Sequence, residues 1–364
     1  MALNLQDAFL AQLKKEGVGV VIFLAKGVQL KGTVKGYDQF TIILEDHEGR
    51  VQMVYKHSVT TVSPSRPVSD DFLKVAFKDA PAKLKHVSRP MLKTLAFQKW
   101  EATGNDFLFI DQESQGILAH QLPIAAVIEA CHRDRGYGAD GVILYSRPES
   151  GQATMTVINS DGSRGDMCGN ALRCLAHILR EKSGQDHHHV ELTSRTVEVS
   201  SLGENQAAVT MGQVQAQGEQ AFMASLADFD AVVGHRGYLC SFGNPHYVVP
   251  VPQIPSNWED LGAALQEPAH RHLGTHGINC GFVETESRSG GRRLRVFERG
   301  AGPTKSCGSG ACAASAVLQH LELGPPPHTL ELPGGQLVIE RRDSAFVLRG
   351  EARLEYLGDW KVEI

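Results

Sequence analysis

The apolar positions change their period along the chain, and these changes predict its organisation. Leu5, Phe9, Leu10 and Leu13 lie on one helical stripe and predict a short amphipathic helix over residues 3–15. Four β-rich runs follow this helix, with turn residues between them: VGVVIFLA, VQLKGTVKGY, FTIILED and RVQMVYKHSVTTV. The chain therefore begins with a small β-rich module, over residues 1–67, that carries one helix.

A change of composition separates this module from the rest of the chain. Residues 68–92 show mixed periodicity, two prolines and an excess of cations. We expect a basic tether there, with one helical turn or more around DDFLKVAF. From about residue 93 a longer block with helix and strand patterns runs to the end, broken by many glycines. This pattern predicts a multi-domain chain with a larger second part.

Composition and charge narrow the class of protein. The 364 residues exceed one typical domain, and the 42% hydrophobic and 21% charged content is that of an ordinary globular protein. The net charge of −5 gives no overall nucleic-acid footprint. No apolar run is long enough to span a membrane, and the first residues lack a signal-peptide core. The seven cysteines, an odd number, favour a reducing compartment, and we expect a cytoplasmic protein.

Two segments of the larger block share one arrangement that carries candidate chemistry. Cys168 and Cys307 each precede a turn of small residues that opens a helix-forming run, ALRCLAHILR and ACAASAVLQHLEL. A thiol at a helix N-terminus faces free N–H groups and the positive end of the helix dipole, which favour the thiolate. Two such thiols predict an acid/base pair that inverts a stereocentre from opposite faces. Cys174 and Cys312 lie inside these runs and are expected to be buried packing residues, and the spacing of the four cysteines disfavours zinc.

Two other motifs are not expected to carry chemistry. GYGADG, at residues 136–141, matches the dinucleotide pattern G-x-G-x-x-G, but the strand-like run VILYS follows it where a nucleotide site needs a helix. His187, His188 and His189 are expected to form a solvated loop with no built metal site. No lysine stands in a phosphate-binding context typical of pyridoxal phosphate. We therefore expect no cofactor and no metal.

Three segments of the first module carry a family resemblance: LQDAFLAQLKKE, FLAKGVQLKGTVKGYDQFTIILE and QMVYKHSVTTVSPSRPV, in this order. Through them the module resembles the Hfq family of bacterial Sm-like RNA chaperones. This resemblance implies a bent five-stranded β-barrel with one helix, assembled as a hexameric ring that binds RNA on both faces. A free monomer is also disfavoured on physical grounds, because a block of this size buries little surface and its strand edges need covering.

The resemblance implies RNA-binding positions on both faces of the module. The positions of a uridine-preferring pocket are Gln6, Gln39, Phe40, Lys56 and His57. An aromatic ring can stack on a base, amides and imidazole can read base edges, and lysine can bind phosphate. The adenine-preferring face matches Phe23, Gly27, Val28, Leu30, Gln52 and Thr61, with Lys31 where the family has a base-reading Gln. The rim carries only Lys14 and Lys15, followed by Gly17, in place of arginines, so we expect weak rim activity.

Six motifs of the larger block carry a second resemblance: EATGNDFLFID, GYGADGVILY, VINSDGSRGDMCGNALRC, FGNPHYVV, GINCGFVE and FERGAGPTKSCGSGACAAS. Through these motifs and their intervals the block resembles the diaminopimelate epimerase family across residues 94–364. This resemblance implies two similar α+β domains, each with a sheet curled around a central helix, and an active site in the cleft between them. The lobes implied are residues 93–213, with about 353–364 returning to them, and residues 214–352.

The same resemblance implies roles for individual residues. Cys168 and Cys307 are the acid/base pair of a cofactor-independent epimerisation of LL- to meso-diaminopimelate. The implied substrate-binding positions are Asn105, Asn159, Gly169, Asn170, Asn244, Asn279, Glu298, Arg299, Gly308 and Ser309, with His246 and Asp161 in supporting roles. Ala171 and Pro303 stand where the family usually has Gly and Glu.

Three other functions stay open at this point. The same fold could racemise another amino acid of the proline or histidine type, although Glu298 and Arg299 favour a substrate with a second amino-carboxylate group. The enzyme half could have become inactive and left an RNA-binding scaffold, although both cysteines are retained. The two thiols could also close into a disulfide and act as a redox switch.

Overall fold

A computed structural model of the chain describes residues 5–24, 29–38, 40–69, 92–147, 152–165, 167–215, 223–274, 277–287 and 290–364. Most of the predicted tether, residues 70–91, lies outside the described residues, and so does the helical turn expected around DDFLKVAF. The chain divides into two compact units, Met1–Arg89 and Pro90–Ile364.

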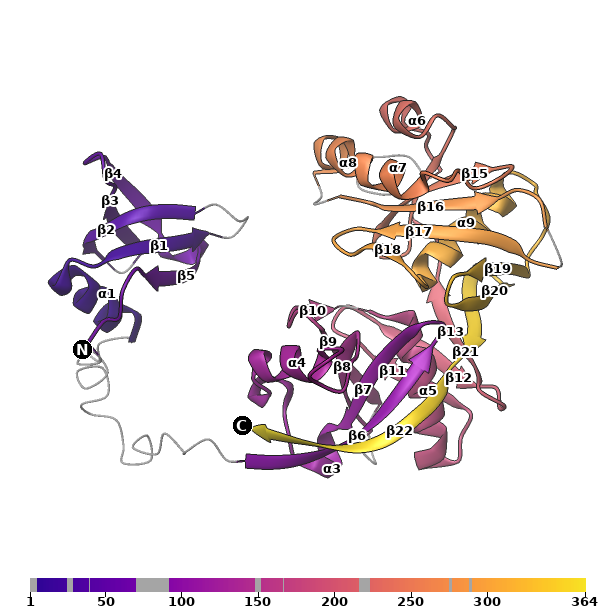
Figure 1. Cartoon of the computed structure of the whole chain (residues 1–364), viewed down its shortest axis with the longest axis horizontal. Coiled ribbons are helices and arrows are strands. Elements are labelled where there is room, and N and C mark those ends of the chain that lie inside the picture. The colour runs from indigo at the N-terminus through magenta and orange to yellow at the C-terminus, as the bar shows by residue number, and fades with distance from the viewer. Residues whose placement is uncertain are drawn as a thin grey trace. The chain divides into compact units, whose positions relative to one another are not determined.

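The first unit is a five-stranded antiparallel sheet with one helix (Figure 1). Its elements are α1 (Leu5–Glu16), β1 (Gly19–Leu24), β2 (Gln29–Tyr37), β3 (Thr41–Glu45), β4 (Val51–Tyr55), a 3-10 turn η1 (Lys56–Ser58) and β5 (Val59–Pro64). The strand order is β4-β3-β2-β1-β5, so β4 and β5 form the two edges of the sheet. The predicted helix and the first three strand runs are confirmed within one or two residues, whereas the fourth run forms two strands, β4 and β5, separated by η1.

The core of the first unit follows the alternation of its strands. Ile22, Ile42 and Leu44 are fully buried, while the residues between them are partly exposed. Leu10 and Leu13 of α1 are buried in the same cluster. The apolar stripe of the helix and one face of the sheet therefore bury each other, which is the main stabilising contact of such a small unit.

The second unit has two lobes, each with a sheet around a central helix. The first lobe contains β6 (Leu92–Ala102), β7 (Asn105–Asp111), α3 (Gln112–Gln115), η3 (Ala119–Gln121), α4 (Ile124–Cys131), β8 (Gly141–Ser146), β9 (Ala153–Asn159), β10 (Arg164–Gly165), α5 (Gly169–Ser183), β11 (His187–Glu191), β12 (Thr196–Ser201) and β13 (Gln206–Gly212). The second lobe contains α6 (Ala227–Val233), β14 (Tyr238–Ser241), β15 (Pro245–Val251), α7 (Trp258–Ala264), α8 (Gln266–Leu273), β16 (Asn279–Glu284), β17 (Arg292–Glu298), β18 (Gly302–Thr304), α9 (Gly308–His320), β19 (His328–Leu332), β20 (Gly335–Arg342) and β21 (Ala345–Glu351). The last strand is β22 (Arg353–Glu363).

The two lobes repeat one strand topology. In each lobe an antiparallel pair (β6–β7 or β14–β15) is followed by a parallel pair (β7–β8 or β15–β16) and another antiparallel pair (β8–β9 or β16–β17). The chain then crosses through a helix, α5 or α9, to a strand parallel to the last one, β11 or β19. Two antiparallel strands complete each lobe. The predicted fold class, two similar domains that each surround a central helix, is confirmed.

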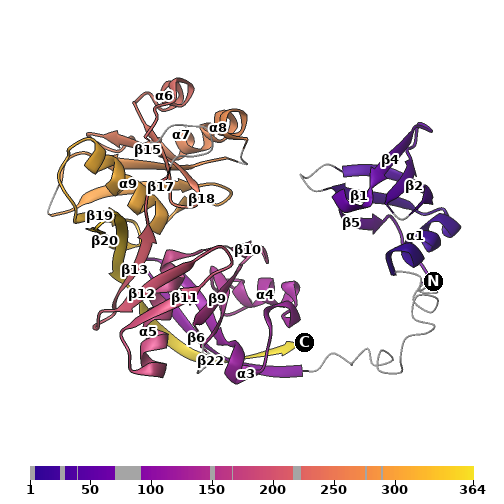
Figure 2. The ribbon, with the colours of Figure 1, turned by 180° about the vertical axis from the view of Figure 1, so that it is seen from behind.

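Two strand pairings tie the lobes together (Figures 1 and 2). β21 pairs with β20 of its own lobe and with β13 of the first lobe. β22 runs antiparallel to β6 along almost its whole length, so the C-terminal strand lies in the first lobe. Helices α5 and α9 are buried on nearly all sides and share one apolar cluster. One apolar cluster of the second unit therefore passes from one lobe to the other, and each lobe has a further cluster of its own.

One expectation about this unit is wrong. His187, His188 and His189 do not form a solvated loop, because they begin strand β11, which pairs with β12. His188 is buried, and its ring lies 3.1 Å from Ser183 Oγ and 2.9 Å from the Gln185 carbonyl oxygen. Alternation along the strand leaves its two histidine neighbours exposed. The pairing of its backbone with β12 therefore determines this strand, although three of its residues are histidines.

The helices that the structure describes are short. The longest is α5, with 15 residues, and none of the described helices is long and apolar enough to cross a membrane.

A glycine in β2 tests the close packing of the first unit. A Cβ at Gly32 would lie 2.4 Å from the Glu45 carbonyl oxygen, whereas a Cβ at Gly36 in the same strand would meet its nearest neighbour, Ile43, at 3.9 Å. We expect Gly32→Ala to destabilise the unit by about 1–3 kcal/mol, since β3 must move. Gly36→Ala serves as the matched control. Amide hydrogen exchange of β2 and β3 in the full chain should quicken only in Gly32→Ala, and equal protection in both variants would contradict this packing.

Candidate active site

Both candidate cysteines are N-caps of the central helices. Cys168 precedes α5 with φ −132° and ψ 110°, and Cys307 precedes α9 with φ −136° and ψ 106°. This extended backbone leaves the first N–H groups of each helix without intrahelical partners, directed at the cap side chain. The prediction that each cysteine precedes a helix is confirmed, and the two caps have almost the same geometry.

The two helix N-termini converge on one side chain. A Cβ at Gly169 would lie 3.0 Å from Leu348 Cδ2, and a Cβ at Gly308 would lie 2.8 Å from the same atom. The Cβ at Gly308 would also come within 3.9 Å of the Gly169 Cα atom. Leu348 is in β21, the strand that pairs with both lobes. The first turns of α5 and α9 therefore meet where the lobes join, and the glycine after each cysteine permits this approach.

Burial opposes the ionisation of Cys168. Burial raises the pKa of this thiol, and the negative charge of Glu298 raises it further. The N–H groups of Ala171 and Asn170 and the guanidinium of Arg173 act in the other direction. The Ala171 nitrogen lies 3.5 Å from Cys168 Sγ. The helix N-terminus thus favours the thiolate as predicted, but burial outweighs it.

Cys307 is held in its protonated form more strongly. It is 5% exposed, and burial followed by the charge of Glu298 raises its pKa well above the ordinary value, against hydrogen bonds from Ser309 and the Gly310 N–H. Ser309 Oγ lies 3.7 Å from Cys307 Sγ. Burial also raises the pKa of Glu298, which accepts a hydrogen bond of 2.6 Å from Thr304 Oγ1. The Glu298 carboxylate disfavours a negative charge on the neighbouring Cys307, so this thiol keeps its proton and is suited to donate it.

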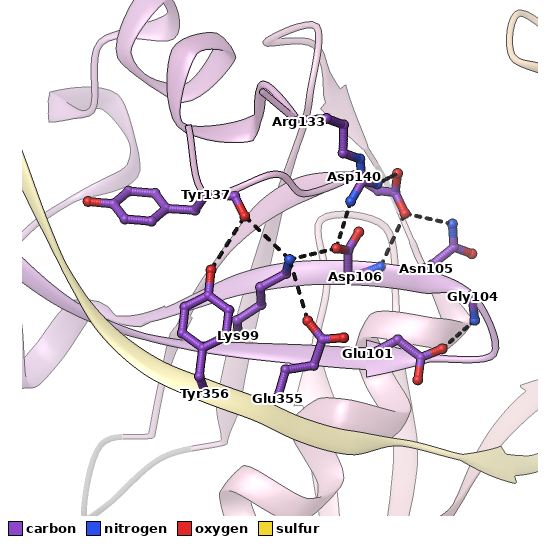
Figure 3. A network of polar contacts seen from close by, with 10 residues as sticks. All are labelled: Lys99, Glu101, Gly104, Asn105, Asp106, Arg133, Tyr137, Asp140, Glu355 and Tyr356. Atoms are coloured by element: carbon purple, nitrogen blue, oxygen red, sulfur yellow. Dashed lines mark hydrogen bonds and ion pairs between the residues drawn. The ribbon is translucent and has the colours of Figure 1, made fainter. Parts of the chain in front are cut away.

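A polar network holds Asn105 beside α5. Asn105 Nδ2 donates to Asp140 Oδ2 at 3.0 Å (Figure 3). Its Oδ1 accepts a hydrogen bond from Asn170 Nδ2 of α5. Asn170 follows Cys168 by two residues and is buried, and its own Oδ1 has no partner among the described residues. An unpaired buried amide oxygen is costly, and it is a candidate acceptor for a substrate ammonium group.

Charged side chains behind Asn105 fix the carboxylate that binds it. Arg133 donates to Asp140 Oδ1 at 2.6 Å and to Asp106 Oδ2 at 2.7 Å, and Lys99 lies 2.9 Å from the same Asp106 oxygen (Figure 3). Burial raises the pKa of Asp106, but the two cations outweigh it and lower the pKa overall. Sequence analysis did not single out Asp140 or Arg133. The motif GYGADG contains Asp140 and could have pointed to it. Strand β8 follows this motif, as predicted, where a nucleotide site needs a helix.

Asn279 braces the second lobe. It is 3% exposed, its Nδ2 donates to the Pro245 carbonyl at 3.1 Å, and its Oδ1 accepts from the Arg299 backbone N–H at 2.9 Å. Asn244 Oδ1 lies 3.0 Å from His246 Nε2. Burial and the charge of Arg299 lower the pKa of His246 to about 3, so its imidazole is neutral and donates to Asn244. These contacts position the turn after β17, where the predicted carboxylate and guanidinium stand.

Asn159 and Asp161 close the hairpin between β9 and β10. Asn159 Nδ2 donates to Ser163 Oγ at 2.9 Å, and Asp161 Oδ1 accepts from the Ser163 N–H at 2.8 Å. The hydrogen bonds from Ser163 lower the pKa of Asp161. Both residues thus shape the segment that leads to Cys168.

In the first unit, part of the predicted uridine pocket lies together. Phe40 is 66% exposed, and its carbonyl accepts a hydrogen bond from the Lys56 N–H. Lys56 Nζ is 2.5 Å from Asp7 in α1, next to the exposed Gln6, and 5.2 Å from the centre of the Tyr37 ring. Lys56 is therefore already paired. Gln39 and the side chain of His57 lie outside the described residues.

The positions predicted for the adenine-preferring face are split between the two sides of the sheet. Phe23 pairs with Thr61, and Lys31 pairs with Val21, so these side chains lie on the face opposite the core. Leu30 and Gln52 lie opposite the buried Ile22 and Leu44, on the side of the core. The other two predicted positions, Gly27 and Val28, are not among the described residues.

The remaining cysteines are packing residues. Cys174 and Cys312 are fully buried inside α5 and α9, as predicted, and burial raises the pKa of both thiols. All seven cysteines are free thiols. Within the described ranges, no three side chains of the His, Cys, Asp and Glu types gather at a point where they could hold a metal ion.

The second unit shares its fold with solved structures of epimerases. A predicted epimerase from Pseudomonas aeruginosa covers 73% of this chain and 99% of its own, with a TM-score of 0.56 and 16% identity. A hydroxyproline epimerase from Agrobacterium vitis covers 76% of this chain and 93% of its own, with a TM-score of 0.54 and 13% identity. At these identities the likeness shows the fold.

Sequence comparison shows to which family the chain belongs. Residues 97–217 and 238–355 match the family model of diaminopimelate epimerase, and residues 5–69 match that of the Hfq protein. The diaminopimelate epimerase of Cyanothece sp. is 34% identical over 263 residues, which cover 68% of this chain and 92% of that protein. The chain therefore belongs to the diaminopimelate epimerase family of isomerases, and it carries an Hfq domain in front. The predicted fusion is confirmed.

The charge of Glu298 predicts a pH effect on its neighbouring thiol. In Glu298→Gln the negative charge beside Cys307 is lost while the side chain keeps its size. Because that charge raises the pKa of Cys307, the thiol should ionise at a lower pH in the variant. The pH dependence of iodoacetamide alkylation of Cys307, followed by peptide mass spectrometry without substrate, measures this shift. Glu259→Gln on α7 is the control, and an unmoved or upward-moved profile in Glu298→Gln would refute the assignment.

Proposed function

We propose that the second unit interconverts LL- and meso-diaminopimelate by a two-thiol mechanism without a cofactor. The observation that carries this proposal is the convergence of two cysteine-capped helices on Leu348. Two acid/base groups of the same kind, one from each lobe, suit a reaction whose forward and reverse directions are mirror images at one carbon. The curated relatives at about this level of identity bear the name diaminopimelate epimerase.

In the proposed reaction, one thiolate removes the α-hydrogen of the substrate as a proton. The electron pair of the broken C–H bond stays on carbon and is delocalised into the adjacent carboxylate. The thiol on the opposite face then donates its proton to that carbon, which forms the new C–H bond and leaves the second sulfur as thiolate. Atoms and charge balance, because one sulfur gains a proton and the other loses one. Proton exchange with solvent then returns the two sulfurs to their resting protonation states.

The resting charge distribution supports an order for these roles. Arg173 and two helix N–H groups favour the thiolate at Cys168, while Glu298 lies next to Cys307 and disfavours a thiolate there. Cys168 therefore acts as base on one substrate epimer, and Cys307 acts as acid. On the other epimer the roles exchange. The N–H groups of the converging helix turns stabilise the carboxylate and the negative charge that develops on it.

The position of Glu298 and Arg299 supports a substrate with a second amino-carboxylate group. Glu298 is half-buried beside Cys307, and the Arg299 backbone is fixed by Asn279. The adjacent carboxylate of Glu298 and guanidinium of Arg299 can bind the ammonium and the carboxylate of a second amino-acid group. Proline and histidine have no such second group. The free thiols that the mechanism needs support a cytoplasmic, reducing location.

Cysteine variants test the mechanism directly. Cys168→Ala and Cys307→Ala should each lose turnover of LL-diaminopimelate by at least about 1,000-fold, since each removes one half of the proton transfer. Cys174→Ala and Cys312→Ala are matched controls, since they truncate buried cysteines of the same two helices. They should keep turnover and lose roughly 1 kcal/mol of stability. Turnover at the wild-type rate in Cys168→Ala or Cys307→Ala would exclude the two-thiol mechanism.

The first unit is proposed to bind RNA as a ring of six copies. Its two edge strands, β4 and β5, lie at opposite ends of the sheet, so pairing of β4 in one copy with β5 in the next is head-to-tail and can close a ring. Val51, Met53 and Tyr55 on β4 are 63%, 57% and 50% exposed. An apolar edge of this kind needs a partner strand, and a second copy supplies one.

Two aromatic residues on opposite faces support the proposed RNA contacts. Phe40 is exposed near Lys56 and the N-terminal end of α1, and Phe23 lies on the other face beside Lys31 by strand register. Exposed aromatic rings stack on unpaired bases in sequence-tolerant RNA sites. We propose uridine-rich RNA at the Phe40 face and adenine-containing RNA at the Phe23 face.

The two phenylalanines allow a matched test of RNA binding. Phe40→Ala should weaken binding of oligouridine by roughly 5–150-fold, the loss of one base stacked on an aromatic ring. Phe23→Ala removes the same ring from the other face and should leave oligouridine affinity unchanged. Fluorescence anisotropy with the full chain measures both, and light scattering on the same samples should give six times 39.6 kDa. Equal losses in the two variants, or a monomeric mass, would contradict the proposed surfaces or the ring.

A further inference from the structure

A buried guanidinium of α5 is linked through hydroxyl groups to the segment that carries Cys307, and its effect on the charge of Cys168 does not account for these contacts. Arg173, in the second turn of α5, is fully buried, and no described carboxylate forms an ion pair with it. Its Nη1 has no hydrogen-bond partner among the described residues. Burial lowers its pKa to about 10, yet at neutral pH it keeps its charge. A buried cation without an ion-pair partner is costly in free energy, so we expect Arg173 to have a function at this place.

The remaining donors of Arg173 connect the two lobes. Nη2 donates to Thr103 Oγ1 at 2.7 Å, and Nε donates to the Glu351 carbonyl at 3.4 Å. Thr103 Oγ1 in turn lies 2.8 Å from Ser306 Oγ, and both hydroxyl groups are buried. Because arginine only donates, the Thr103 oxygen accepts from it and its proton is available for Ser306. Ser306 is the residue before Cys307, so this chain of side chains leads from one cysteine-bearing helix to the other cysteine.

The turn that carries Thr103 is pressed into the second lobe. Thr103 has a φ of +48°, which is unfavourable for a β-branched residue and persists only where the surroundings impose it. A Cβ at Gly334 would lie 1.9 Å from the Thr103 carbonyl oxygen, and a Cβ at Gly104 would lie 3.0 Å from both Gly334 Cα and Lys305 Cβ. The Gly334 N–H also donates to the Lys305 carbonyl at 2.9 Å. The β6–β7 turn thus docks on the segment that leads to Cys307.

We propose that Arg173, Thr103 and Ser306 form an inter-lobe chain of positioning residues that holds Cys307 in register with Cys168, with the Arg173 charge favouring the Cys168 thiolate. This inference rests on the proposed two-thiol function and adds the residues that align its two halves. None of the three touches the substrate carbon. Their contribution is the separation and orientation of two sulfurs that must lie on opposite faces of one atom, where a displacement of about 1 Å costs on the order of 100-fold in rate.

The hydroxyl of Thr103 gives the sharpest test. Thr103→Val keeps the shape but removes the acceptor for Arg173 and the contact with Ser306, whereas Thr103→Ser keeps the hydroxyl. Thr103→Val should lower kcat by roughly 10–100-fold with KM nearly unchanged, because it disturbs alignment and not ground-state binding. Thr103→Ser should stay within about 3-fold of wild type. Ser306→Ala, at the other end of the chain, should resemble Thr103→Val.

The charge of Arg173 is tested separately by its effect on Cys168. Arg173→Gln removes the cation, so alkylation of Cys168 by iodoacetamide should require a higher pH than in wild type, while Arg173→Lys should keep the wild-type profile. This measurement needs no substrate, and unfolding midpoints identify variants that fail to fold. If Arg173→Gln does not fold, the Thr103 and Ser306 variants decide the proposal.

The outcomes separate this inference from the proposed function. A wild-type chain without turnover of diaminopimelate would contradict the function, and the alkylation profiles would still report on the Arg173 chain. Wild-type kcat in folded Thr103→Val, or equal losses in Thr103→Val and Thr103→Ser, would overturn the positioning role. An unmoved Cys168 profile in folded Arg173→Gln would overturn the electrostatic role.

Discussion

The enzyme half depends on how closely the N-termini of α5 and α9 approach each other. Both first turns pack on Leu348, and a Cβ at Gly169 or Gly308 would press on the end of this side chain. Because each helix is capped by a cysteine, this contact brings the two cysteine-bearing turns together. The strand that carries Leu348 pairs with both lobes, so the sheet architecture, the glycines and the cysteines serve the same constraint. The repeated topology of the lobes supplies the two equivalent caps.

Much of this arrangement could be predicted from local sequence, for physical reasons. A cysteine before small residues and a helix-forming run gives an N-cap whatever the rest of the fold, and both caps were predicted. The alternating runs of the first module likewise became strands. His187–His189 were predicted wrongly, because the pairing of β11 with β12 is a tertiary contact that composition does not report. Burial of the thiols, which reverses the expected effect of the helix ends on their pKa, also depends on distant segments.

Some residues of the site could not be predicted from the sequence, because they act through other residues. Asp140 contacts Asn105 from a motif that resembles a nucleotide-binding loop, and Arg133, just after α4, binds Asp140 in turn. Arg173 lies within the same run as Cys168, but its contact with Thr103 links segments 70 residues apart. Such residues carry no motif of their own. The Hfq domain presents a different case, since its edge strand β4 carries exposed apolar residues, which the proposed ring accounts for.

The central claim is that two thiols on opposite faces share one carbon, and the fate of solvent deuterium tests it most directly. We would incubate the full chain with LL-diaminopimelate in D₂O and follow deuterium in the substrate and product pools during the first turnovers. With one base removing the proton and a second, solvent-equilibrated thiol delivering another, each meso product should carry one deuterium at the inverted carbon. The remaining LL substrate should stay nearly unlabelled. Equal early labelling of substrate and product would indicate a single base that serves both faces, and would contradict this account.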